Sequence, residues 1–208
     1  MSKIKIIGID FSGNRTVNEF IKFSNFDFDS ITISKFKHEL NLSNTKIKIH
    51  TGENKKFGLD GGSPELSENL AKEFHDKIFS ALNGAEIIIC ISDFFGDDGE
   101  GISSAVADIS KEVRALSIFY AIIPNKKLIV PCRQKHVEKF LQKLTEKADY
   151  VIQIDFWYFT KFLNNGIRLD IFTEMCERLT AIDVDYFLKN YLKWSEKICE
   201  LQLGMSKD

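Results

Sequence analysis

Proline is scarce in this sequence and cysteine is never paired: there are three prolines and four cysteines among 208 residues. The cysteines (Cys90, Cys132, Cys176 and Cys199) never form a C-x-x-C pair, which excludes the usual zinc and redox spacings. No apolar run reaches the length of a membrane-spanning helix, and the N-terminal run is too short for a signal peptide. We therefore expect a cytoplasmic chain with free thiols and no membrane insertion.

The sequence also lacks an excess of one charge: 28 Lys and Arg are interleaved with 30 Asp and Glu. Sequence-independent binding of nucleic acid needs a dense basic face, so the charge pattern argues against it. An apolar content of 44% is typical of a globular protein, and the length suits one domain. The 18 phenylalanines indicate a Phe-rich core or, as the alternative, an apolar surface for a partner.

Several catalytic motifs are missing. There is no GxxxxGK[ST], HExxH or G-x-S-x-G string, which removes support for a P-loop, a metalloprotease or a serine hydrolase. The first glycine-bearing loop does not read G-x-G-x-x-G, so a dinucleotide site on a Rossmann-like sheet is only weakly supported.

Short apolar runs alternate with segments of helical period. The runs predict buried strands at residues 3–10, 31–34, 46–50, 86–92, 115–123 and 149–155. Helical spacing of apolar residues predicts helices after Gly13, over 64–82 and 102–113, around 137–144, and at about 168–181 and 184–203. This alternation favours an α/β fold, a Rossmann-like three-layer sandwich with a mostly parallel sheet.

Parallel sheets bind ligands where strand-to-helix loops meet beyond the carboxyl ends of the strands. The loops at 10–15, 57–63, 93–101 and 155–160 are therefore the places to search. Three of them carry glycine and open a helix, whose free N–H groups and positive dipole end suit an anion. The loops thus raise the hypothesis of a phosphate site.

The order of these loops resembles the nucleotide-binding domain of the FtsZ/tubulin family. IKIIGIDFSGNRTVNEFI is similar to the family's first strand and loop, and FGLDGGSPELSENLAKEF to its GLGAGGNPE loop. NGAEIIICISDFFGDDGEG is similar to the strand that leads into the signature loop GGGTGTG, and the register holds from Ala85 to Ile123. The resemblance is strong over residues 1–123 and loose over 124–208.

The resemblance implies a set of candidate site residues and a ligand. It implies GTP or GDP with Mg²⁺, bound by phosphate-contacting and base-reading residues. It also implies a catalytic loop in AIDVDYFLKNYL, where Asp185 matches an acid of the family and Asp183 stands at an asparagine position. The implied nucleotide-binding residues are Gly13, Asn14, Asn18, Gly61, Gly62, Gly96, Gly99, Gly101 and Asp170, and the implied catalytic ones are Asp183 and Asp185.

The phosphate loops nevertheless carry acids where the family carries Gly or Thr. Asp97, Asp98 and Glu100 stand in the signature loop, and Asp10 stands in the first loop. Unit charges 4 Å apart repel by about 4 kcal/mol at an effective dielectric near 20, and micromolar binding amounts to only about 8 kcal/mol. The acids in the signature loop either turn away from a ligand, form a solvated turn, or hold Mg²⁺ or Ca²⁺.

Two functional hypotheses remain open. In one, the chain is a weak nucleotide binder or pseudo-GTPase that acts through contact with itself, as a dimer or filament, or with an FtsZ/tubulin-like filament or division protein. In the other, it is a working GTPase that uses a bridging cation and a neighbouring subunit. Residues 1–208 are expected to form a single domain without the family's second domain.

Overall fold

The computed structural model describes residues 2–52, 63–124, 129–155 and 168–205. Six parallel strands form one sheet in the order β3-β2-β1-β4-β5-β6. They are β1 (Ile4–Ile9), β2 (Asp29–Ser34), β3 (Ile47–His50), β4 (Ile87–Asp93), β5 (Leu116–Ile123) and β6 (Tyr150–Asp155). Every residue of β1 and β4 is buried, as expected for central strands covered on both faces. The predicted parallel α/β sheet is confirmed.

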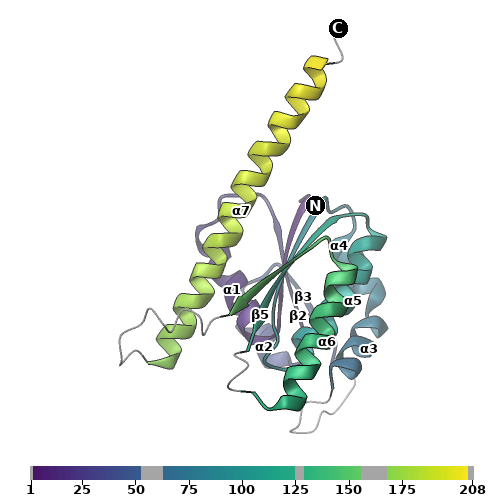
Figure 1. The fold of residues 1–208 in the computed structure, drawn as a ribbon, viewed down its shortest axis with the longest axis vertical. Coiled ribbons are helices and arrows are strands. Elements are labelled where there is room, and N and C mark those ends of the chain that lie inside the picture. Colours follow the sequence, from purple (N-terminus) through teal and green to yellow (C-terminus); the bar gives the residue numbers. More distant parts are fainter. Residues whose placement is uncertain (1, 53–62, 125–128, 156–167, 206–208) are drawn as a thin grey trace.

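Helices cover both faces of the sheet and complete a three-layer sandwich (Figure 1). One face packs against α3 (Pro64–Glu73), α4 (His75–Leu82), α5 (Asp97–Glu112) and α6 (Pro131–Lys147). The other face packs against α1 (Asp10–Phe23) and α7 (Leu169–Met205), which also contact each other. Alternate side chains of each strand enter the two cores, so Ile7 and Ile9 lie in the first and Ile4 and Ile6 in the second.

Three local predictions are wrong. The short helix α2 (Lys37–Leu42) fills the polar connection expected between β2 and β3. The helix expected over 64–82 is interrupted at Phe74, where α3 ends and α4 begins. The two C-terminal helices are one continuous helix, α7, because buried Ala181, Val184 and Leu188 carry its core-facing stripe across the expected break.

Helix α7 is the longest element, with 37 residues. At 1.5 Å per residue it is about 55 Å long. It begins at the carboxyl edge of the sheet, passes α1 and continues beyond the amino edge (Figure 1). Among the described residues, no helix is both long and apolar enough to cross a membrane.

Candidate functional site

Carboxylates gather at the carboxyl edge of the two central strands. Asp10 follows β1 directly and begins α1 with a positive φ of 61°, a conformation that a non-glycine residue rarely adopts. Asp93 ends β4 and is buried, and its Oδ2 accepts a hydrogen bond of 2.8 Å from the backbone N–H of Ser12. The first turn of α1, where the sequence predicted a loop, is therefore joined to the end of β4 by this hydrogen bond.

Burial and mutual repulsion raise the pKa values of these acids. Desolvation, followed by the charges of Asp93 and Asp98, holds the pKa of Asp10 well above its ordinary value. Desolvation raises the pKa of Asp93 to about 6, against backbone N–H groups that lower it. The pKa of Glu39 on α2 rises to about 7, first through burial and then through the charge of Asp10. This end of the sheet already disfavours negative charge.

Asp98 in the first turn of α5 is buried in an ion pair. Its Oδ1 lies 2.6 Å from Nζ of Lys35, and each of these side chains is only 3% exposed. Lys35 follows β2, and Ser67 of α3 donates a second hydrogen bond of 2.7 Å to the same oxygen. Asp98 thus connects α5 with α3 and with the end of β2.

Glu100 is also buried and joins α5 to α6. Nη2 of Arg133 lies 2.8 Å from Oε1 of Glu100. The same Nη2 donates to the backbone carbonyls of Phe94 and Gly96, at 3.0 and 2.8 Å. Arg133 therefore holds the signature loop from the side of α6.

The described acids do not form a cluster of three potential metal ligands. In the described part of the chain, no three His, Cys, Asp or Glu side chains lie together so that they could hold a metal ion. Asp98 and Glu100 are paired with cationic side chains instead, and the side chain of Asp97 lies outside the described residues. Asp98 and Glu100 of the signature loop therefore connect α5 to α3, to α6 and to the end of β2.

The predicted glycines lie where backbones approach closely. A Cβ on Gly13 would stand 2.2 Å from the carbonyl oxygen of Ile91, and one on Gly99 would stand 1.6 Å from that of Asp93. A Cβ on Gly101 would stand 2.1 Å from the carbonyl oxygen of Pro64. Packing between helix and strand, or between two helices, therefore accounts for these three glycines.

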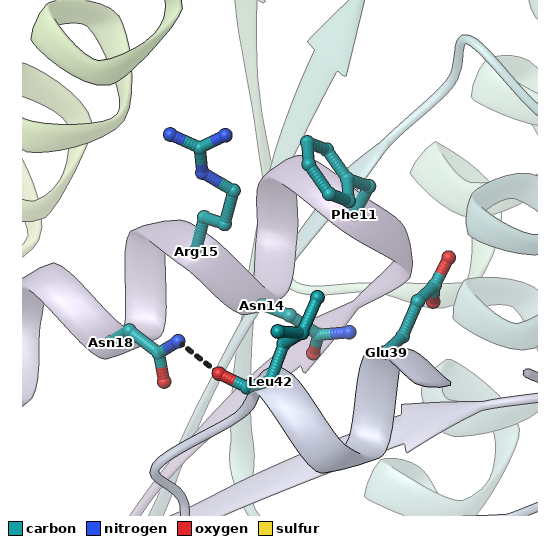
Figure 2. A pocket seen from close by; sticks show the side chains of 6 residues that line it. All are labelled: Phe11, Asn14, Arg15, Asn18, Glu39 and Leu42. Atoms are coloured by element: carbon teal, nitrogen blue, oxygen red, sulfur yellow. Dashed lines mark hydrogen bonds between the residues drawn. The ribbon is translucent and has the colours of Figure 1, made fainter. Parts of the chain in front are cut away.

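The remaining predicted binding positions do not all lie at one site. Gly96 precedes α5 and gives its carbonyl to Arg133. Asn14 is buried in α1, and Asn18 one turn later connects α1 to α2 by donating from Nδ2 to the carbonyl of Leu42, at 3.1 Å (Figure 2). Gly61 and Gly62 lie outside the described residues.

A cavity of about 510 Å³ lies between the first loop, the signature loop and the start of α7. Its walls include Asp10, Asp93 and Gly96 from the loops, and Leu169 and Phe172 from α7. Asp170 does not line this cavity. It is exposed, and its Oδ2 is paired with Arg168 at 2.6 Å.

The two predicted catalytic acids lie in the middle of α7 and not in a loop. Asp183 is exposed, whereas Asp185 is buried and its Oδ2 pairs with Lys189, one turn along, at 2.6 Å. The expectation of an acidic loop there is wrong, since the helix continues through both residues. Their catalytic role stays a prediction.

Sequence reasoning missed the partners of the acids. Lys35, Ser67 and Arg133 lie far along the chain from Asp98 and Glu100, and no spacing rule connects them. The sequence did contain one clue to Asp93 and Lys35. Each comes directly after a predicted strand, at the edge of the sheet where ligands bind.

Comparison with known proteins agrees with this architecture. The family model described as "Tubulin/FtsZ family, GTPase domain" matches residues 3–164. The empty FtsZ dimer of M. jannaschii superposes with a TM-score of 0.78 at 21% identity, over 89% of this chain and 54% of that one. CetZ2 of Haloferax volcanii, described as a GTPgS-bound protofilament, gives 0.76 at 19% identity, over 90% and 58%. TubZ of Clostridium botulinum phage c-st gives 0.61 at 14% identity, over 84% and 57%.

The chain thus spans a little more than half the length of these structures. At such identities the likeness concerns the fold, whereas the family match covers most of the chain, including the first loop and the signature loop. The chain belongs to the Tubulin/FtsZ family and carries the fold of its GTPase domain.

Proposed function

We propose that this domain is a pseudo-GTPase or weak nucleotide binder that acts through protein contacts, foremost with further copies of itself. The observation that carries the proposal is the buried ion pair of Lys35 and Asp98, whose Nζ and Oδ1 atoms are 2.6 Å apart. The pair lies at the carboxyl edge of the sheet, between the end of β2 and the start of α5. A lysine near that position is a natural partner for phosphate, but here an internal carboxylate uses it.

The acids that line the cavity support the same reading. Asp10 and Asp93 face the space beside the glycine-bearing loops, and their pKa values are already raised. A triphosphate beside two carboxylates would meet repulsion of about 4 kcal/mol for each pair of charges at 4 Å and an effective dielectric near 20. In their charged form these two acids would therefore oppose the phosphates of GTP.

Self-association is supported by the relatives and by α7. Two of the similar structures are described as a dimer and as a protofilament. The outer face of α7 exposes Ile171, Met175, Leu179, Ile182 and Tyr186, each between 43% and 67% exposed. Their spacing of three or four residues makes one apolar stripe opposite the core. We propose a filament- or division-associated role on the analogy of the family alone.

A titration of labelled GTP, with and without Mg²⁺, tests the nucleotide part of the proposal. The wild-type chain is expected to show no binding, or only weak binding, at several hundred micromolar. The double variant Asp10→Asn and Asp93→Asn keeps an acceptor for Ser12 but removes both charges, so its affinity should rise at least tenfold. Asp27→Asn, an exposed acid at the other edge of the sheet, is the matched control.

The second candidate is a GTPase that holds Mg²⁺ between the nucleotide and the cavity acids. The cavity of about 510 Å³ favours it, because ligand sites commonly measure roughly 300–1,000 Å³. Mg²⁺ typically binds one or two carboxylates together with phosphates. Micromolar, Mg²⁺-dependent binding that the double variant abolishes would establish this candidate and refute the pseudo-GTPase.

A further inference from the structure

A second cavity lies on the other side of Phe11, between α1 and α2. It measures about 280 Å³ and is lined by Phe11, Asn14, Arg15 and Asn18 from α1, and by Glu39 and Leu42 from α2. Figure 2 shows these side chains around one space, into which α1 and α2 each project polar groups. The cavity is separate from the one against α7, and Phe11 is the side chain that the two share.

Asn14 is the unusual member of this set. Its side chain is 4% exposed, yet neither Nδ2 nor Oδ1 has a hydrogen-bond partner. Asn18, one turn along the same helix, uses both amide atoms, donating to the Leu42 carbonyl and accepting from the Asn44 N–H. A buried amide without partners costs stability, so its presence at a cavity wall needs an explanation.

The other residues that line the cavity indicate which ligand could form hydrogen bonds with the amide of Asn14. Glu39 is 7% exposed, and one of its oxygens accepts a hydrogen bond of 2.6 Å from Ser34, which leaves acceptor capacity on the carboxyl group. Phe11 is 44% exposed and Leu42 is 65% exposed, so both offer apolar surface at the mouth.

Arg15 does not supply a free positive charge. Its Nε pairs with Glu177 of α7 at 2.9 Å, and its guanidinium lies 5.2 Å from the centre of the Phe11 ring. The site therefore combines a carboxamide, a carboxyl group and an aromatic ring, and the arginine on its wall is already paired.

We propose that the cavity between α1 and α2 binds an uncharged planar heterocycle of the nucleobase type. Such a ring presents a hydrogen-bond donor beside an acceptor along one edge, which is what the two amide atoms of Asn14 require. Glu39 accepts a further N–H from the same ring, and Phe11 covers its face. The volume is close to the lower end of ligand cavities, about 300 Å³, and suits one small ring system.

This inference concerns another cavity than the proposal about GTP, and the ring binds without phosphates. Nucleosides are therefore the appropriate probes: guanosine, adenosine, cytidine and uridine, titrated into the ¹⁵N-labelled full chain and followed by NMR. At least one is expected to bind at or below millimolar concentration and to shift the amide signals of Phe11, Glu39 and Leu42.

Two variants locate the site. Asn14→Leu replaces the amide by an apolar group of similar size and should weaken nucleoside binding at least tenfold. The same change should leave the thermal midpoint of the free protein unchanged or raise it, because it removes an unpaired buried amide. Glu39→Gln keeps an acceptor for Ser34 and should change the order of affinity among the four nucleosides. Asp27→Asn should alter neither property.

The inference is overturned if no nucleoside binds at 10 mM, or if binding is the same in Asn14→Leu as in the wild type. It is also overturned if Asn14→Leu lowers the thermal midpoint and Glu39→Gln leaves the order of affinity unchanged, since the amide would then be structural. If Asn14→Leu does not fold, Glu39→Gln alone decides between these outcomes.

Discussion

At the scale of single residues, glycine is needed at the signature loop for packing. The backbone of Gly99 lies against the carbonyl of Asp93, whereas Gly84 has a φ of +77° and no atom within 4 Å of the place that a Cβ would occupy. Gly99 is therefore required because two backbone segments approach closely, whereas Gly84 is required because of its backbone conformation.

Changing each glycine to alanine separates these requirements. Gly99→Ala would place a methyl group 1.6 Å from a carbonyl oxygen and should destabilise the fold by more than about 3 kcal/mol, or prevent folding. Gly84→Ala carries only backbone strain, which costs about 1–2 kcal/mol. Urea unfolding followed by circular dichroism measures both. Equal losses in the two variants would contradict the packing role of Gly99.

The pair of Lys35 and Asp98 makes a second prediction at this scale. Lys35→Met leaves a buried carboxylate without its cation and should cost about 3–5 kcal/mol in the free energy of unfolding. Adding Asp98→Asn removes the remaining charge and keeps an acceptor for Ser67, so the double variant should recover most of that loss. If the double variant is no more stable than the single one, the cost does not come from the unpaired charge.

At the scale of elements, α7 has one buried face and one exposed face. The inner face supplies Phe172, Cys176 and Leu188 to the core, while the outer face carries the apolar stripe from Ile171 to Tyr186. Further along the helix the exposed outward positions include Lys189 and Lys193. Among the residues whose side chains are described, the apolar stripe runs from Ile171 to Tyr186, in the first half of α7.

Replacing Leu179 and Ile182 by glutamate tests whether this stripe mediates self-association. Both side chains are nearly half exposed, so the free energy of unfolding should change by less than about 0.5 kcal/mol. Sedimentation velocity should show fewer oligomers than in the wild type, because charges on an apolar contact oppose association. Lys193→Glu is the control on the same helix. Oligomers that persist unchanged in the double variant would place the contact elsewhere.

At the scale of the whole molecule, buried acids make stability depend on pH. The folded-state pKa of Asp93 is about 6, and those of Glu39 and Glu177 are about 7, compared with ordinary values of 3.8 and 4.5. Desolvation is the main cause in each case. Between pH 4.5 and 7 the folded protein therefore binds more protons than the unfolded chain.

We expect the protein to be more stable at pH 5.5 than at pH 8. The stabilisation is fully present below the unfolded pKa values and is lost as the pH rises through 6 to 7. The difference should be on the order of 2 kcal/mol, since each pKa unit corresponds to about 1.4 kcal/mol and solvent penetration reduces the full value. Urea unfolding in buffers of constant ionic strength measures it.

The double variant Glu39→Gln and Glu177→Gln is the control for this pH dependence. It removes two of the raised carboxyl groups and should flatten the change between pH 5.5 and 8. His75, whose pKa is raised by Asp76 and Glu112, acts with the same sign and stays in the variant. A slope as steep as in the wild type would show that other groups cause the effect.

The amino-acid sequence by itself determined the sheet and the position of the candidate site. Runs such as IIGI and IIICI are apolar throughout, and such runs are typically buried between two layers of helices. Glycines 13, 96, 99 and 101 marked the carboxyl edge of the sheet in the sequence, although the reason for three of them, close backbone packing at positions 13, 99 and 101, is tertiary. The order of these loops was also enough to suggest the family.

Only the tertiary structure decided what the acids do. The pairing of Asp98 with Lys35 and of Glu100 with Arg133 joins elements that are distant in sequence, and no local pattern encodes such contacts. The continuity of α7 through Asp183 was likewise decided by packing, because its buried stripe outweighs the weak helix preference of aspartate. The negative charge of Asp98 and Glu100 could be read from the sequence. The cationic side chains that pair with them are brought within a few ångströms only by the fold.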